Sequence, residues 1–356
     1  MAMQSGSGLL EWLAVAVKMK QARGINAGEF VVNGTSMMMR SSRGGMEWTT
    51  SLIHAFLNAS NSKSEVGGAQ KLKSLEESVS ELVFEVLENV VGVDMKSPNP
   101  ITKELPMVSS PVPVLSCICL YLLVVWLWSS HIKSSGQKPR KEDPVALRCL
   151  VIAHNLFLCI LSAFMAVGLV AAHRFYGYKR IWGNKYDERE PGMNLLIYVF
   201  YMSKLYEFMD TAIMLVRRNL RQVTYLHLYH HTSISMIWWI LCYRSPGADA
   251  YFSAAFNSAI HVAMYFYYLL AAIVGKDEKR RRKYLFWGKY LTIMQMLQFL
   301  SFIAQAIYCL YNPEVYPKGV GRMLFFYSCS LLAFFGNFFV NKYRRPKQAK
   351  ITAKTE

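Results

Sequence analysis

Seven long apolar segments constrain the fold of this chain more than any other feature of its sequence. A helix that crosses the hydrocarbon core of a bilayer needs about 20 consecutive, mostly apolar residues. Of the 356 residues in this chain, 53% are hydrophobic. We therefore expect an all-α integral membrane protein with seven transmembrane helices. The predicted spans are Val112–Ser130, Cys149–Ala172, Met193–Val216, Val223–Tyr243, Ala250–Val274, Tyr284–Tyr311 and Met323–Asn341.

The rest of the sequence divides around these spans. Residues 1–45 are rich in Ser, Gly and Met and have no long apolar run, so we expect a flexible extension, with a transit peptide as the alternative. Residues 46–110 combine an amphipathic pattern with a Pro-rich linker. The seven helices occupy residues 111–343, and residues 344–356 form a basic tail. Asn33 and Asn58 begin glycosylation sequons that would be used if this end is lumenal.

Basic residues gather in alternate loops between the predicted spans. Lys and Arg number 40 against 23 Asp and Glu, and they concentrate after the first, third, fifth and seventh spans. Because cytosolic loops carry the excess of positive charge, the C-terminus is expected in the cytosol and the N-terminus across the membrane. The basic residues flank spans rather than cover a soluble domain, which argues against binding to nucleic acid.

The seven cysteines all fall within predicted spans: Cys117, Cys119, Cys149, Cys159, Cys242, Cys309 and Cys329. Their spacing matches neither a metal site nor a disulfide framework. We expect them to act as small, buried apolar side chains.

A histidine triplet lies in the fourth predicted span, at His227, His230 and His231. Offsets of i, i+3 and i+4 place the three imidazoles on one face of a helix. In hydrocarbon such a polar face must point toward the protein interior. This histidine box predicts a site of chemistry; the structural alternative is a set of polar groups that bond to neighbouring helices.

Other spans carry polar residues at helical spacing. These are His154 and Asn155; Lys204, Glu207, Asp210 and Thr211; Asn257, His261, Met264, Tyr265, Tyr267 and Tyr268; and Thr292, Gln295 and Gln298. Ionisable groups inside a span are costly unless they pair within a polar interior. A single intramembrane histidine usually bonds to a neighbouring helix, so His154 predicts packing rather than catalysis. Salt bridges, interfacial tyrosines and polar contacts between helices are the structural alternatives for the other groups.

Together these segments resemble the ELO-type membrane elongases of very-long-chain and polyunsaturated fatty acids. The resemblance rests on Lys204-Leu-Tyr-Glu207-Phe-Met-Asp210-Thr211, His227-Leu-Tyr-His230-His231, Asn257-Ser-Ala-Ile-His261-Val-Ala-Met264-Tyr265-Phe-Tyr267-Tyr268, Thr292-Ile-Met-Gln295-Met-Leu-Gln298 and the span count. It covers residue 46 to the C-terminus. Gln222, five residues ahead of the first histidine, resembles the polyunsaturated branch, and further segments are similar to moss and algal elongases of Δ6 or Δ5 acyl chains.

The resemblance implies both a fold and a reaction. The fold is a barrel of six helices, spans two to seven, around an acyl tunnel, with the first span outside. The reaction is the condensation of a long acyl-CoA with malonyl-CoA, which gives a 3-ketoacyl-CoA two carbons longer, CO₂ and CoA, without a cofactor or a metal. Residence in the endoplasmic reticulum is also implied, and Lys354 supplies part of a dilysine-type signal.

The resemblance also implies roles for individual residues. A neutral imidazole can attack a thioester and hold the acyl group, so the box would supply the nucleophile, and we expect it to be His230. His261 would be a second reactive imidazole or proton carrier, and His227 and His231 would orient the nucleophile or handle protons. Electrostatic and positioning roles fall to Lys204, Glu207 and Asp210. Substrate-binding roles fall to Asn257, Tyr265, Tyr268, Thr292, Gln295, Gln298 and Gln222.

Two other classes of protein remain as alternatives. Membrane di-iron desaturases and hydroxylases share the His-x-x-His-His pattern but spread about eight histidines over three boxes, whereas this chain has one box. A seven-helix receptor or transporter is the non-enzymatic alternative. The expected partners are the bilayer, acyl-CoA, malonyl-CoA, the reductases and dehydratase of the elongation cycle, and a second copy of the chain.

Overall fold

The computed structural model describes residues 68–140, 142–312 and 317–344, and the chain divides into two units, residues 1–78 and 79–356. In the first unit the described residues, 68–78, are helical and belong to helix α3 (Gly68–Val86). The predicted extension over residues 1–45, the sequons at Asn33 and Asn58, and Lys354 lie outside the described residues.

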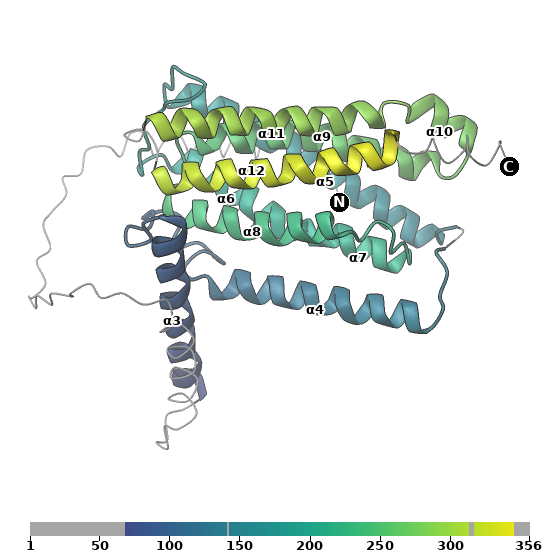
Figure 1. Ribbon diagram of the computed structural model, residues 1–356, viewed down its shortest axis with the longest axis horizontal. Helices are drawn as coiled ribbons and strands as arrows, with labels where there is room; N and C mark the ends of the chain where they lie inside the picture. The colour runs from purple at the N-terminus through teal and green to yellow at the C-terminus, as the bar shows by residue number, and fades with distance from the viewer. Residues whose placement is uncertain (1–67, 141, 313–316, 345–356) are drawn as a thin grey trace, which may run out of the picture. The chain divides into compact units, whose positions relative to one another are not determined.

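Regular structure in the described part of the second unit is entirely helical, which confirms the all-α prediction for these residues (Figure 1). A short π-helix, η1 (Leu87–Val91), comes first. The α-helices that follow are α4 (Val112–Ser134), α5 (Val145–Phe175), α6 (Pro191–Tyr206), α7 (Phe208–Val216), α8 (Tyr225–Arg244), α9 (Ala250–Val274), α10 (Glu278–Tyr284), α11 (Gly288–Tyr311) and α12 (Lys318–Phe339). A second short π-helix, η2 (Val340–Arg344), continues from α12.

Five segments among the described residues are long and apolar enough to cross a membrane: α4, α5, α9, α11 and α12 with its extension to Tyr343. Their outward surfaces are apolar, as a lipid environment requires. Leu120, Trp126 and Val167 expose 61%, 65% and 70% of their surface. Two of the seven predicted spans are not among these five. Met193–Val216 is divided into α6 and α7, and α8 carries the histidine box.

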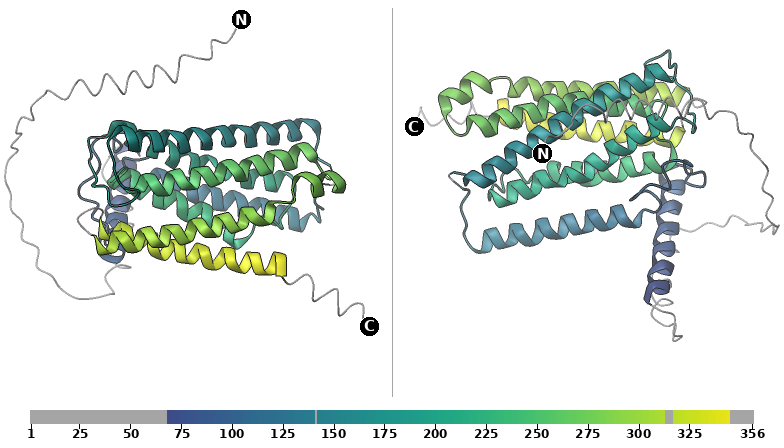
Figure 2. Two further views of the ribbon diagram at one scale, coloured as in Figure 1. Left: turned by 90° about the horizontal axis from the view of Figure 1, so that it is seen from above. Right: turned by 180° about the vertical axis from the view of Figure 1, so that it is seen from behind.

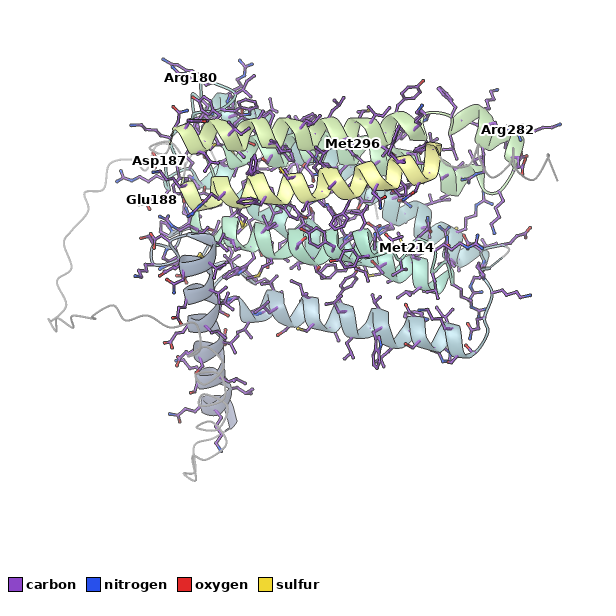
Figure 3. The ribbon with its side chains drawn as sticks, viewed as in Figure 1. Arg180, Asp187, Glu188, Met214, Arg282 and Met296 are labelled. Atoms are coloured by element: carbon purple, nitrogen blue, oxygen red, sulfur yellow. The ribbon has the colours of Figure 1, made fainter. Side chains whose placement is uncertain are left out.

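Six helices form a closed circuit of neighbours. Along this circuit α5 packs against α9, α9 against α11, α11 against α12, α12 against α8, α8 against α6, and α6 against α5. Helix α4 contacts α7 and α8 and lies outside the circuit. Figure 2 shows the six helices of the circuit running side by side. Figure 3 places Arg180, Asp187 and Glu188 at one end of the bundle and Arg282 at the other.

The break between α6 and α7 falls on Glu207, although no Pro or Gly lies near it. The backbone N–H of Asp210 donates to the carbonyl of Glu207, 3.0 Å away, in an i to i−3 bond. Such a tightened turn changes the direction of the side chains around it, and mid-helix turns of this kind often mark functional positions. The side chains after Glu207 therefore point in directions different from those that one continuous helix over this span would give them.

The segment between η1 and α4 is packed against the bundle rather than forming a free linker. Asn99 N–H donates to the Tyr243 carbonyl at 2.7 Å, the Tyr201 hydroxyl donates to the Met107 carbonyl at 3.0 Å, and the Trp239 indole donates to the Val108 carbonyl at 3.2 Å. These bonds tie the segment to α6 and to the end of α8. Backbone groups that leave water need such partners.

Close backbone contact joins the same segment to the start of α12. A Cβ atom added to Gly319 would lie 2.0 Å from the carbonyl oxygen of Gly92. Real Cβ atoms do not approach another atom this closely, so only glycine fits at Gly319. Gly92 itself has φ +74°, a left-handed conformation that glycine adopts without strain.

Candidate active site

A buried ion pair lies at the break between α6 and α7. Lys204 Nζ is 2.7 Å from Oε1 of Glu207, and the two residues expose 1% and 2% of their surface. Lys204 also donates to Oδ1 of Asn257 on α9, at 3.2 Å, and lies over the Phe200 ring. Charges removed from water need this degree of pairing. The predicted pairing of Lys204 within the interior is therefore found with Glu207 and not with Asp210.

Glu207 connects this pair to an imidazole on α9. Its Oε1 atom is 3.4 Å from Nδ1 of His261, which is also buried. One carboxylate thus faces both a cation and a histidine, which come from different helices. A carboxylate beside a ring nitrogen fixes the orientation of the imidazole and the position of its proton.

Asp210 makes a second, separate set of bonds. Its Oδ1 atom is 2.8 Å from Nε2 of His154 on α5, and its Oδ2 atom accepts a hydrogen bond of 2.9 Å from the Tyr265 hydroxyl on α9. The other nitrogen of His154 is 3.4 Å from the Tyr206 hydroxyl. The prediction that His154 bonds to a neighbouring helix is confirmed, and its partner Asp210 belongs to the polar cluster. Its spacing along α5 carried no signal of this partner.

The histidine box begins in the first turn of α8. The Thr224 side chain caps the helix by accepting a hydrogen bond from the His227 backbone N–H at 3.2 Å. Nε2 of His227 is 2.7 Å from the Thr211 hydroxyl, which is itself 2.8 Å from the Tyr121 hydroxyl on α4. The His227 and His231 rings are 4.3 Å apart between centroids, and the His230 and His231 rings meet edge to face at 5.5 Å.

His230 lines a cavity that is partly open to its surroundings. The cavity is bounded by α8, α9, α11 and α12, and it follows α8 from His230 to Leu241. At about 1.5 Å per residue, this is a length of roughly 16 Å. Asn257 and Gln298 also line the cavity. In the described part of the chain, Nδ1 of His231 and Oε1 of Gln298 are buried without a hydrogen-bond partner.

The opposite end of the cavity is closed by a network that the sequence did not predict. Asp249 lines this end and accepts backbone hydrogen bonds from Gly183, at 2.8 Å, and Asn184, at 3.0 Å. Gln305 donates to the Asp249 carbonyl at 2.6 Å and accepts from the Ser253 hydroxyl at 2.8 Å. The partners are about 50 to 65 residues apart in the chain. No local pattern links them.

The remaining predicted site residues lie at the edge of the cluster. The Thr292 hydroxyl donates within its own helix to the Gly288 carbonyl, and Gln295 lies against the Met264 sulfur at 3.7 Å. The Tyr268 ring packs on Tyr265 but exposes 44% of its surface. Gln222 is exposed and accepts a hydrogen bond from Asn219 at 2.7 Å. The structure therefore brings Gln298 to the cavity wall and leaves Gln222 on the surface.

The acidic groups and imidazoles meet in separate small sets rather than around one point. Within the described residues, no group of three or more His, Cys, Asp or Glu side chains converges in a way that could hold a metal ion. Each set instead links α8 or α9 to α6 or α7, the two helices that stand in place of the third predicted span.

Comparison with known proteins finds similarity over most of this chain. Residues 106–351 match the model of the family described as ELO: GNS1/SUR4 family. Very long chain fatty acid elongase 5 of Tachysurus fulvidraco is 34% identical over 236 residues, which cover 66% of this chain and 76% of that protein. The human elongase 5 is 34% identical over 244 residues, with coverage of 66% and 75%. Very long chain fatty acid elongase 4 of Macaca mulatta is 34% identical over 253 residues, with coverage of 70% and 77%.

Proposed function

This chain belongs to the ELO (GNS1/SUR4) family, whose members include fatty acid elongases, and from that premise we propose that it catalyses the condensing step of fatty acid elongation. The substrates are a long-chain acyl-CoA, polyunsaturated in the proposed case, and malonyl-CoA. The products are a 3-ketoacyl-CoA two carbons longer, CO₂ and CoA. The reaction consumes one proton per turnover, because the departing CoA thiolate leaves as a thiol.

The first half-reaction transfers the acyl group to His230. A ring nitrogen of His230 attacks the thioester carbonyl, the C–S bond breaks, and an acyl-imidazole and CoA are formed. One observation carries this assignment. Of the histidines in the described part of the chain, His230 is the one that lines the cavity, whereas His154, His227 and His261 each have a ring nitrogen bonded to a carboxylate or hydroxyl, and Nδ1 of His231 is buried away from the cavity without a partner.

The second half-reaction forms the new carbon–carbon bond. Malonyl-CoA loses CO₂ to leave an enolate, and its carbon attacks the acyl-imidazole and releases His230. Donors that stabilise the enolate oxygen lower the barrier. Asn257 supports this role, because its amide oxygen accepts from Lys204, its N–H groups remain to donate, and it lines the same cavity as His230. Glu207 holds both Lys204 and His261 in place.

The cavity supports an acyl tunnel. An alkyl chain attached at His230 would extend along α8 toward Asp249, and the closed circuit of six helices would form the surrounding barrel. In this proposal α6 with α7, and α8, complete a set of seven spans. The break at Glu207 makes α6 and α7 each shorter than a full span, with 16 and 9 residues, and the histidine box makes α8 less apolar than the other five segments. The basic cytosolic loops would receive the CoA phosphates in the endoplasmic reticulum membrane, where the reductases and dehydratase of the cycle act.

The test uses purified full-length protein in detergent or liposomes. With labelled malonyl-CoA and a panel of saturated and polyunsaturated acyl-CoAs, we expect a labelled 3-ketoacyl-CoA. With acyl-CoA alone, we expect release of free CoA and a protein mass increased by one acyl group. His230→Ala should abolish both signals. His131→Ala, which changes an exposed histidine on α4, should leave both intact.

Two results would count against the proposal. Absence of labelled product from the wild-type protein across the panel would remove the condensing function. Product formation without acylation of the protein, or full activity in His230→Ala, would remove the acyl-imidazole route but not the function.

A further inference from the structure

Helix α4 lies outside the circuit of six helices, yet it sends one side chain to the histidine box. Tyr121 is buried on α4, with 8% of its surface exposed, and its ring stacks on Phe208 with 4.2 Å between centroids. Its hydroxyl is 2.8 Å from Oγ1 of Thr211, which is 2.7 Å from Nε2 of His227. A continuous chain of three polar groups therefore runs from an outer helix to the box.

The number of hydrogens in this chain restricts its arrangements. A threonine hydroxyl carries one hydrogen and two lone pairs. Thr211 is fully buried, and in the described part of the chain its hydroxyl has no partner besides Tyr121 and His227, so its hydrogen goes to one of these two. If Tyr121 donates to Thr211, then Thr211 donates to Nε2 of His227, and the ring hydrogen of a neutral His227 lies on Nδ1. If His227 donates from Nε2, then Thr211 donates to the Tyr121 oxygen. In both arrangements the Tyr121 hydroxyl completes the bonding of Thr211.

The orientation of His227 matters to the other two imidazoles. Its ring lies 4.3 Å from the His231 ring, and the His231 ring meets His230 edge to face at 5.5 Å. A rotation of His227 would therefore be transmitted to the ring that packs directly on His230. Aromatic contacts of this type depend strongly on geometry.

We propose that Tyr121 is a positioning residue for condensation, acting through Thr211 on the orientation and tautomer of His227. This inference rests on the function proposed above. Tyr121 touches no reacting atom, so its loss should slow the chemical step and leave substrate binding unchanged. Outer partners of catalytic histidines commonly contribute about 10-fold or more in activity.

The substitution Tyr121→Phe tests this, because it keeps the stacking on Phe208 and removes only the hydroxyl. We expect kcat to fall about 10-fold with KM within about 2-fold. Tyr201→Phe is the matched control, since Tyr201 is fully buried and its hydroxyl donates to the Met107 carbonyl, at 3.0 Å, away from the box. That control should keep the wild-type kcat.

A double-mutant cycle separates positioning from general loss of packing. Thr211→Val breaks the same chain at its centre, so adding Tyr121→Phe to it should cause little further loss, whereas independent effects would multiply. Thr211→Ser keeps the hydroxyl and should restore kcat. Wild-type kcat in Tyr121→Phe, an equal loss in Tyr201→Phe, or multiplying effects in the double variant would overturn the inference. The wild-type sample in the same assay reports on the proposed function separately.

Discussion

His154 on α5 and Asp210 on α7 form a hydrogen bond, with 2.8 Å between Nε2 and Oδ1. A carboxylate oxygen accepts a hydrogen from the Nε2–H tautomer of His154, so this contact favours that tautomer. The second oxygen of Asp210 is held by the Tyr265 hydroxyl. Helices α5 and α9, which pack closely on each other, therefore both hold the Asp210 carboxylate. Asp210 lies just after the break at Glu207.

Replacement of His154 should impair the proposed reaction although the residue lies outside the histidine box. His154→Leu removes the donor and should lower kcat about 10-fold, because Asp210 loses one of its two supports. His154→Gln keeps an N–H donor and should recover part of that loss. Steady-state condensation assays measure both. His173→Leu is the control on the same helix, where a buried histidine bonds to the Arg180 carbonyl; equal losses in both leucine variants would contradict a specific role.

The buried pair of Lys204 and Glu207 should be unusually sensitive to loss of one partner. Lys204→Met leaves the Glu207 carboxylate buried with only His261 beside it, and should destabilise the protein by about 3–5 kcal/mol. The double variant Lys204→Met/Glu207→Gln removes both charges and should recover much of the stability. Thermal unfolding in detergent would measure the differences.

An exposed ion pair provides the comparison for that measurement. Lys103 and Glu104 are 3.6 Å apart, and their side chains are 43% and 75% exposed. Lys103→Met should change stability by about 0–1 kcal/mol, since exposed pairs contribute little. If Lys204→Met/Glu207→Gln is no more stable than Lys204→Met, the uncompensated charge of Glu207 is not the cause of the destabilisation.

The contact between Gly319 and Gly92 should not tolerate a side chain. Gly319→Ala places a Cβ atom 2.0 Å from the Gly92 carbonyl oxygen and should destabilise the protein by about 1–3 kcal/mol as the segment shifts away from α12. Gly336→Ala on the same helix meets nothing within 4 Å and should leave stability unchanged or slightly higher. Unfolding temperatures measured side by side test this, and equal values for the two variants would refute it.

The far end of the cavity should set which acyl chains fit. Val320 lines this end and is 4% exposed, so Val320→Phe should shorten the space available beyond His230. We expect kcat/KM to shift toward shorter acyl-CoAs in a panel of graded chain length. Val124→Phe, at an exposed position on α4, is the control. An unchanged preference in Val320→Phe would mean that the acyl chain does not enter this cavity.

The residues of the site were predictable because burial in lipid restricts which polar groups a span can carry. Lys204, Glu207, Asp210, His261 and the histidine box stood out for this reason, and the structure brings them together or close to one another. Their pairing was not predictable. Helical spacing suggested a shared face for Lys204, Glu207 and Asp210, but the turn at Glu207 gives Asp210 a different set of partners.

Some features had no signal in the local sequence. Tyr121 lies in a span that resembles a simple anchor, and Asp249 follows a loop, yet one bonds to Thr211 and the other closes the end of the cavity. Hydropathy also predicted seven spans, whereas five described segments have the length and apolar character of a span. At the third position the break at Glu207 divides the helix into two short pieces, and at the fourth position the histidine box makes α8 less apolar.

By itself, the sequence determined the helical character, the membrane environment and the set of polar residues that the interior must accommodate, because backbone hydrogen bonding and the cost of burying charge act residue by residue. The tertiary structure alone decided which of those residues meet. His154 with Asp210, Thr211 with His227 and His230 with the cavity are contacts between helices distant in the chain, and they depend on how the helices pack. Packing is a property of all the surfaces together, so no single segment encodes it.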